Sequence, residues 1–216
     1  MINIENVEIT NTGNAAYDFS PQTESLNISG NSGNDTITGG AGADTINGLA
    51  GNDDIDGGGG NDIIYTGSGI EDLFGGAGND RMFGNGGGDA FYGGLGDDVM
   101  RGGAEADDFD GGDGDDKIHG GDGDDWLTDG LGDDELHGGE GLDTYYRDFD
   151  ETNPNENWIP HVDLVREGLF SPTFPGLKGD ILTGFENVDL DGSLNMMITG
   201  SDGNNALSAG AGDDVI

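Results

Sequence analysis

The chain has 216 residues, of which 46 are Gly and none is Cys, and its 45 Asp and Glu far outnumber its 6 Lys and Arg. A formal net charge of −39 argues against nucleic acid and anionic membrane surfaces as partners, because both select basic patches. The lack of Cys excludes disulfides and thiol chemistry. A chain this acidic and this poor in hydrophobic residues is expected to be largely disordered without counterions.

Residues 1–29 are expected to cap the repeats that follow. Residues 4–9 look like a short strand, and residues 26–29 lead directly into the first repeat. Terminal repeats of solenoids need such a cover over their open edge. We therefore predict flanking strands that stack on the first coil.

Residues 30–146 form thirteen consecutive nonapeptides with no insertion or deletion. Position 4 is Gly in every unit except one, where it is Glu105, and position 6 is Asp in every unit except one, where it is Glu71. Position 8 is apolar in all thirteen units. This array resembles the RTX (hemolysin-type) calcium-binding repeat family, whose known signature is G-G-x-G-x-D-x-U-x.

Each unit has the composition of a tight turn followed by a short strand. Gly adopts left-handed backbone conformations without a steric penalty, so the Gly-rich first positions indicate a turn. The last three positions alternate polar, apolar and polar, which is typical of a strand with one inward side chain. Two units make one coil of 18 residues. The predicted fold class is all-β, a right-handed parallel β-roll (a β-helix-like solenoid) with flanking capping strands.

Position 8 is predicted to form two rows of side chains that face each other across a thin core. One inward side chain in nine residues buries too little apolar surface to offset the conformational entropy lost by the chain, so another source of stability is needed. The two predicted rows are Ile46, Ile64, Met82, Met100, Ile118 and Leu136, and Ile37, Ile55, Leu73, Phe91, Phe109, Leu127 and Tyr145.

A bound cation is the expected source of that stability. Stacking places the acid of one unit beside the acid two units later, where the two carboxylates repel unless a metal ion lies between them. Oxygen ligands with no Cys and almost no His suit Ca²⁺ rather than Zn²⁺; Asp residues that merely cap turns are the weaker alternative. The array offers up to about eleven Ca²⁺ sites. The predicted metal ligands are Asp35, Asp44, Asp53, Asp62, Glu71, Asp80, Asp89, Asp98, Asp107, Asp116, Asp125, Asp134 and Asp143, with Asp214 near the C-terminal end.

These acids fall on two edges of the roll. The even edge, from Asp44 to Asp134, keeps Asp at position 6 and Gly at position 4 throughout, and we predict uniform occupancy there. The odd edge, from Asp35 to Asp143, contains both departures from the pattern. Glu71 is one methylene too long and Glu105 introduces a Cβ where the turn requires Gly, so weaker calcium binding is predicted around them.

Residues 147–199 are predicted to be a spacer between RTX blocks, with strands at 161–165 and 180–182. Residues 185–190 repeat residues 4–9 almost position for position, and nonapeptides then resume at 200–216. Asn205 should weaken calcium binding in the first resumed unit, whereas Asp214 restores the pattern. We interpret residues 200–216 as the truncated start of a second RTX block, and the chain as a fragment of a longer array.

Several outward side chains allow two interpretations. His119 and His137 should stack on one exposed face, next to Arg101; solvated imidazoles are favoured over a transition-metal site because no third ligand is evident. Tyr65 with Phe83, Phe74 with Tyr92, and Trp126 also point outward. Cross-strand ladders that stiffen a sheet are favoured over a patch for a partner.

Catalytic motifs such as H-E-x-x-H and G-x-S-x-G are absent, so no enzymatic activity is expected. The RTX resemblance implies a secreted protein, extracellular or cell-surface associated, that is exported by type I secretion machinery and folded by extracellular calcium. We recognise no signal peptide, no C-terminal export signal and no apolar window that could insert into a membrane. Two alternatives remain open. The chain could be the C-terminal module of a secreted protease, lipase or epimerase whose catalytic domain lies in the rest of the parent polypeptide, or a stalk or surface-layer segment of an RTX adhesin.

Overall fold

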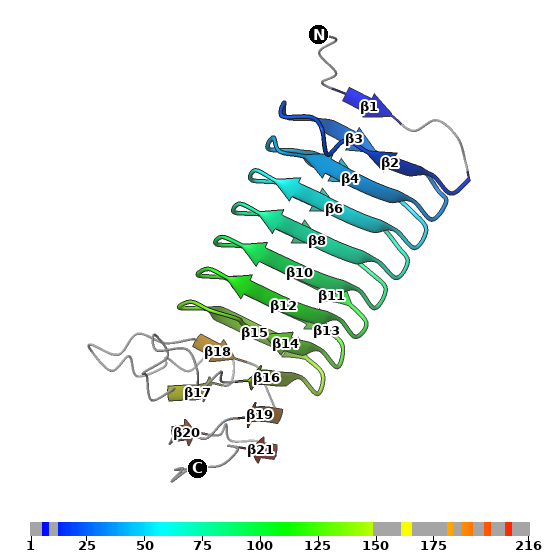
Figure 1. The fold of residues 1–216 in the computed structure, drawn as a ribbon. Helices are drawn as coiled ribbons and strands as arrows, with labels where there is room; N and C mark the ends of the chain where they lie inside the picture. The colour runs from blue at the N-terminus through cyan, green and yellow to red at the C-terminus, as the bar shows by residue number, and fades with distance from the viewer. Residues whose placement is uncertain are drawn as a thin grey trace.

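A computed structural model of the chain describes residues 6–8, 13–148, 161–165, 181–183, 187–191, 197–199 and 206–208, with only the backbone described beyond residue 146. Two parallel β-sheets wind into one solenoid, because as far as residue 148 the chain passes alternately from one sheet to the other (Figure 1). This architecture confirms the predicted all-β parallel roll. The described residues contain no helix, and hence none long and apolar enough to cross a membrane.

We call the 11-stranded sheet sheet A and the 10-stranded sheet sheet B. Sheet A contains, in spatial order, β1 (Asn6–Glu8), β3 (Asn27–Ser29), β5 (Thr45–Asn47), β7 (Ile63–Tyr65), β9 (Arg81–Phe83), β11 (Val99–Ala104), β13 (Lys117–Asp122), β15 (Glu135–Glu140), β18 (Ile181–Thr183), β17 (His161–Val165) and β20 (Met197–Thr199). Sheet B contains β2 (Ala16–Asp18), β4 (Thr36–Gly40), β6 (Asp54–Gly59), β8 (Asp72–Ala77), β10 (Ala90–Leu95), β12 (Asp108–Asp113), β14 (Trp126–Thr128), β16 (Thr144–Asp148), β19 (Asn187–Asp191) and β21 (Ala206–Ser208).

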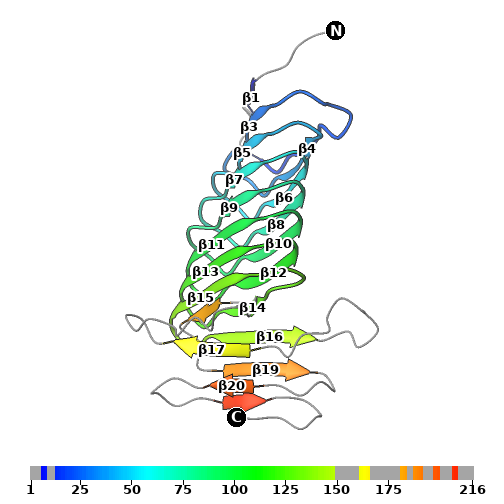
Figure 2. The same ribbon diagram turned by 90° about the vertical axis from the view of Figure 1, so that its left-hand side faces the viewer.

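The 18-residue coil sets the register of both sheets. Ile37 of β4 is opposite Ile55 of β6, which in turn is opposite Leu73 of β8, and each pair is 18 residues apart. Parallel strands normally need a long crossover connection. Here the connection is the strand of the opposite sheet with a turn at each end, which is why the two sheets lie back to back around one axis (Figure 2).

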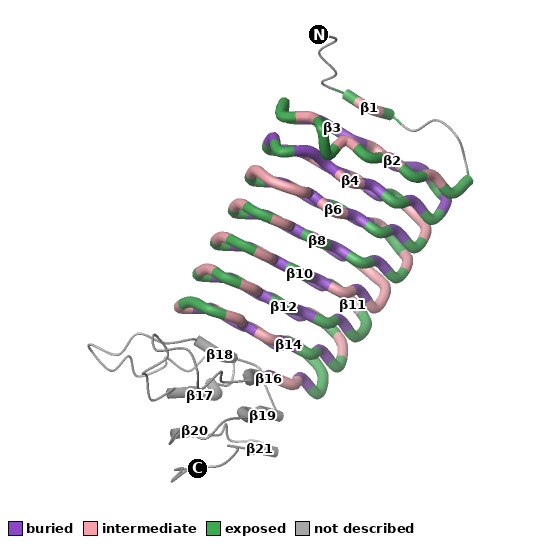
Figure 3. The backbone as a smooth tube through the Cα atoms, viewed as in Figure 1, coloured by how far each residue is buried: buried purple, intermediate pink, exposed green. Residues whose placement is uncertain are grey.

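The core between the sheets consists of the two predicted rows of position-8 side chains. Each of these side chains is at most 1 % exposed. Buried, intermediate and exposed residues alternate along the coils (Figure 3). Phe91 and Phe109 stack within one row, with ring centroids 4.5 Å apart. A single inward side chain in each strand therefore suffices to fill this thin interior.

Strands from both flanking segments extend the two sheets. β1 pairs with β3 and β2 pairs with β4, and Leu26 and Ile28 of the N-terminal segment are buried in the core. In the region predicted to be a spacer, β18 pairs in parallel with β15, and β19 pairs with β16. The break in the nonapeptide pattern is therefore no break in the sheets, because these strands take the positions that further repeats would occupy.

Candidate metal centre

The turns that carry the position-6 acids have two conformations. In ten of the thirteen turns, the residues at positions 2 and 4 both have φ between +71° and +156°. The turns that begin at Gly30, Gly39 and Thr66 lack this pair of left-handed residues. Such conformations favour Gly, and most of these positions are Gly. Glu105 occupies one of these positions with a φ of +71°. Its Cβ is therefore held in a backbone conformation that suits Gly.

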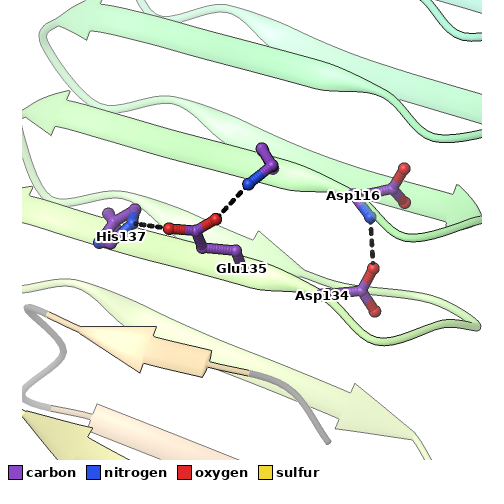
Figure 4. Close-up of polar contacts among 5 residues, drawn as sticks. Asp116, Asp134, Glu135 and His137 are labelled. Atoms are coloured by element: carbon purple, nitrogen blue, oxygen red, sulfur yellow. Dashed lines mark hydrogen bonds and ion pairs between the residues drawn. The ribbon is translucent and has the colours of Figure 1, made fainter. Parts of the chain in front are cut away.

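Position-6 acids of adjacent coils lie side by side along each edge. The backbone N–H of Asp116 donates a hydrogen bond of 2.8 Å to Oδ1 of Asp134, 18 residues later (Figure 4). The same bond forms at ten of the eleven steps on the two edges. The exception is the step from Asp53 to Glu71. One oxygen of each of these Asp carboxylates is thereby satisfied within the protein.

The other carboxylate oxygen of most of these acids is buried and accepts no hydrogen bond from the described residues. A buried polar atom without a partner is costly, and a row of them requires an explanation such as a bound ion. The acids with such an oxygen Oδ2 include Asp53, Asp62, Asp80, Asp89, Asp98, Asp107, Asp116 and Asp125, and both side-chain oxygens of Glu71 are in the same condition.

Each unsatisfied Asp oxygen, from Asp53 to Asp125, lies beside position 1 of its own turn. A Cβ added at Gly75 would lie 2.7 Å from Oδ2 of Asp80 and 2.6 Å from the carbonyl oxygen of Gly93 in the next coil. At Gly93 the corresponding distances are 2.6 Å to Oδ2 of Asp98 and 2.2 Å to the carbonyl oxygen of Gly111. A carboxylate oxygen and a carbonyl oxygen from adjacent coils therefore converge on a space that only Gly leaves open.

Burial also changes the acidity of these groups. Desolvation, with smaller contributions from neighbouring carboxylates, raises the pKa of Asp62 and of Asp98 to about 7. The pKa of Asp107 is raised to about 7 and that of Asp116 to about 6, again chiefly by burial. Without a cation, the folded roll therefore shifts these carboxyl groups towards the protonated form.

The donor set fits a hard cation such as Ca²⁺, which prefers carboxylate and carbonyl oxygens. No three side chains of His, Cys, Asp or Glu converge on one point within the described residues. Carboxylates from adjacent coils would thus need carbonyl oxygens of the turns to complete a shell of roughly six to eight ligands. The position-1 carbonyls described above are candidates for that role.

The first acid of each edge differs from those that follow. Oδ2 of Asp35 accepts a hydrogen bond of 2.9 Å from the N–H of Asn31, and Oδ2 of Asp44 accepts one of 2.8 Å from the N–H of Gly40. Both belong to turns without left-handed residues at positions 2 and 4. Neither carboxylate needs a cation to satisfy its oxygens. Asp44, the first acid of the even edge, therefore differs from the later acids of that edge, which was predicted to be uniform. Its occupancy remains a prediction.

The turn that carries Glu71 has a second departure from the repeat, at position 1. Thr66 replaces Gly there, and its hydroxyl donates a hydrogen bond of 2.6 Å to the carbonyl oxygen of Gly84. In neighbouring coils the equivalent carbonyl lies beside an acid oxygen. The hydroxyl of Thr66 therefore satisfies a carbonyl that would otherwise be available to an ion, while burial raises the pKa of Glu71.

A second hydrogen-bonded row at position 5 is not predicted by the sequence analysis. Oδ1 of Asn61 accepts the N–H of Asn79 at 3.0 Å, and Oδ1 of Asp97 accepts the N–H of Asp115 at 3.1 Å. This exposed row runs in the opposite sense to the position-6 row. The frequent Asn or Asp at position 5 of the nonapeptides is the sequence feature that could have predicted this row. The acceptors at position 5 are Asn34, Asn52, Asn61, Asn79, Asp97, Asp115 and Asp124, and Asn14, which precedes the array, accepts the N–H of Asn34.

The predicted outward side chains form stacks. The rings of His119 and His137 are 4.4 Å apart, and Nε2 of His137 lies 3.2 Å from Oε1 of Glu135, the side chain that also pairs with Lys117 (Figure 4). The predicted stacking of the two imidazoles is confirmed. Asn205 and Asp214 lie outside the described residues.

Comparison with known proteins agrees with this geometry. The family model of the RTX calcium-binding nonapeptide repeat (4 copies) matches residues 29–64, 65–100, 83–118, 92–127, 119–150 and 197–216. These matches cover more than half of the chain. None of the curated proteins matches it. The repeat, the parallel roll and the row of buried acids thus agree with one another, and the chain belongs to the family of RTX calcium-binding nonapeptide repeat proteins.

Proposed function

We propose that this chain is a non-enzymatic calcium-binding β-roll that folds when it meets extracellular calcium. The observation that carries this proposal is the row of buried carboxylate oxygens without hydrogen-bond partners. A roll with so many unsatisfied acids, in a chain of net charge −39, is poorly stable by itself. Metal binding and folding are then one coupled event.

The proposed ligands are the position-6 acids that keep an unsatisfied oxygen, from Asp53 to Asp125, together with carbonyl oxygens of adjacent turns. A bound Ca²⁺ would supply the positive charge that lets neighbouring carboxylates remain ionised in a buried position. The protein's own part is to hold those oxygens at the spacing of the coils. The position-6 hydrogen bonds do this, because each orients one oxygen and leaves the other directed into the turn.

RTX repeats are typical of secreted proteins, and we propose that the roll belongs to a secreted bacterial-type protein exported by type I machinery. Calcium is scarce inside cells and plentiful outside them, so the chain would stay unfolded before export and fold afterwards. This folding would lock the exported chain outside the cell. The catalytic activity of the parent protein, if it has one, would reside in a domain outside these 216 residues.

A stalk or surface-layer segment of an RTX adhesin is the second candidate function. It is favoured by the continuation of both sheets beyond the nonapeptide array, where β19 and β21 extend sheet B in parallel register. A rod that continues through its spacer suits a rigid connector. The module of a secreted protease, lipase or epimerase is the remaining proposal, and the neighbouring part of the reading frame distinguishes the two.

The first test follows far-ultraviolet circular dichroism while Ca²⁺ is added to the chelated chain, with Mg²⁺ as the comparison ion. A cooperative change from coil to β-structure with Ca²⁺ alone is expected, because Mg²⁺ tolerates large, flexible oxygen sites poorly. A β-rich spectrum that persists in chelator would show that the core and flanking strands are sufficient, and would contradict coupled folding.

A matched pair of variants tests the proposed ligands directly. Asp98→Asn removes a charged ligand shared by two steps of the even edge and should lower the number of bound Ca²⁺ by about one or two. Asp97→Asn is the control, since Asn keeps the oxygen that accepts the N–H of Asp115, as Asn79 does for Asp97. Equilibrium dialysis measures both. Equal calcium stoichiometry in the two variants would exclude Asp98 as a ligand.

A further inference from the structure

The outer faces of the two sheets carry opposite charges. In the part of the chain with described side chains, every Lys, Arg and His lies at position 7 or 9 of sheet A, on strands β9 to β15. From β3 to β15, Glu135 is the single acid at these outward positions of sheet A. We call this surface face A. Its cationic and titratable side chains are Arg81, Arg101, Lys117, His119 and His137.

Face A retains unneutralised positive charge. Glu135 pairs with Lys117 and His137, whereas Arg81 and Arg101 form no ion pair with any described residue. Both Arg side chains are exposed. They lie on the adjacent strands β9 and β11, in which Arg81 is opposite Val99 and Arg101 is opposite Phe83. The two groups are thus available to an anionic partner that repeats at the spacing of the strands.

The outer surface of sheet B from β4 to β14, which we call face B, has the opposite character. It carries no Lys, Arg or His. Asp54 and Asp72 are opposite each other on adjacent strands, and burial together with the charges of Asp72 and Asp56 raises the pKa of Asp54. The acids at the outward positions of face B are Asp54, Asp56, Asp72, Asp108 and Asp110.

Each face also has one stacked aromatic pair. Tyr65 and Phe83 stack on face A with ring centroids 5.0 Å apart, and Phe74 and Tyr92 stack on face B at 4.8 Å. Tyr65, Phe74 and Tyr92 remain 37–42 % exposed. The predicted cross-strand stacking is confirmed, and it leaves apolar surface beside charges on both faces, a combination suited to an interface.

The two faces are also matched in spacing. Both repeat once per 18-residue coil, with neighbouring strands about 4.8 Å apart. A row of Asp on face B of one molecule can therefore meet Arg81 and Arg101 on face A of another without a change of period. A second copy is the favoured occupant, because one chain carries complementary charges on its two opposite faces.

We propose that folded rolls associate side by side, with face A of one copy against face B of the next. Because the two contacting surfaces differ, this contact is heterologous and can continue from copy to copy as an open array. The inference depends on the proposed function, since bound Ca²⁺ must first fold the roll and neutralise the acidic edges that would otherwise repel a neighbour.

The test measures the mass of the full chain in saturating Ca²⁺ by light scattering coupled to size exclusion. At low salt we expect an apparent mass at least twofold that of the monomer, falling to the monomer value at about 0.5 M salt, where the Debye length is a few ångström. Arg81→Glu with Arg101→Glu reverses the charge of face A, and Asp72→Arg with Asp108→Arg removes most of the negative charge of face B. Each double variant alone should remain monomeric, and an equimolar mixture of the two should associate again.

The control, Asp113→Arg with Asp122→Arg, changes the net charge by as much as the face B variant but at the exposed last residues of β12 and β13, and should associate as the wild-type chain does. Calcium-induced circular dichroism on every sample shows whether the roll has folded. A wild-type chain that folds with calcium yet stays monomeric at low salt overturns the proposed contact and leaves calcium binding intact. So does a monomer that binds polyglutamate through face A. A chain that shows no calcium-induced change contradicts the proposed function itself.

Discussion

At the scale of single residues, three residues other than Gly adopt the left-handed backbone conformation in the described turns. Leu49, Asn85 and Glu105 have φ values of 79°, 75° and 71°. Asn tolerates this region, whereas a Cβ on Leu or Glu costs about 1–2 kcal/mol. Glu105 holds the conformation that Gly adopts in the other turns of its type, so the surrounding coils impose the shape of the turn.

Replacing Glu105 by Gly should therefore stabilise the calcium-bound roll. We expect the free energy of unfolding to rise by about 0.5–1 kcal/mol, because relief of strain exceeds the extra entropy of Gly in the unfolded chain. The weak bond from the N–H of Gly87 to Glu105, at 3.2 Å, is lost at an exposed site. Urea denaturation measures the change. Glu105→Gln is the control, since it removes the charge and keeps the strain; an equal gain in both variants would assign the effect to charge.

At the scale of the turn and its strand, Thr66 and Glu71 change the same unit in two ways. Thr66 bonds to the carbonyl of Gly84, and positions 2 and 4 of this turn, Gly67 and Gly69, lack the left-handed φ found in most other turns. The acid is also longer, and the hydrogen bond from the N–H of Asp53 is missing at this step. These differences support the prediction that calcium binding is weaker at this step of the odd edge.

Restoring the repeat in that unit should add a bound ion. We expect Thr66→Gly combined with Glu71→Asp to bind about one more Ca²⁺ per chain than the wild type, because the double variant frees a carbonyl and shortens the acid. Equilibrium dialysis counts the ions. Glu71→Asp alone is the control, since the Thr66 hydroxyl still occupies the carbonyl, and its stoichiometry should not change. An unchanged count in the double variant would mean that another feature of the coil excludes the ion.

At the scale of the whole molecule, charge dominates the behaviour of the metal-free chain. Several buried acids have pKa values raised to about 6 or 7 in the folded roll, against about 3.9 for Asp in an unfolded chain. Between these values the folded state binds more protons than the unfolded state. Its stability is therefore present at low pH and is lost as pH rises through the folded pKa values.

In chelator, lowering the pH from about 8 to about 5 should therefore increase the β-structure of the chain. In calcium the trend should oppose this, because protons compete for the carboxylates and the Ca²⁺ concentration needed for folding rises as pH falls. Far-ultraviolet circular dichroism at several pH values measures both trends. A metal-free chain whose β-signal decreases on acidification would show that the raised pKa values do not govern its stability.

The sequence by itself determined the period, the two core rows, the parallel roll and the stacking of His119 on His137. These features follow from local alternation and an exact 18-residue coil, because position in the unit decides which way a side chain points. For the same reason, the pairing of acids from adjacent coils could be inferred from Asp98 and Asp116 without coordinates, although its occupancy by calcium stays a prediction.

Only the tertiary structure decided which oxygens are satisfied within the protein. Whether Oδ2 of Asp44 meets the N–H of Gly40, or Oδ2 of Asp98 meets no donor, depends on the conformation of each turn against its neighbours rather than on residue type. The continuation of the sheets through β18 and β19 depends likewise on hydrogen bonds between distant residues.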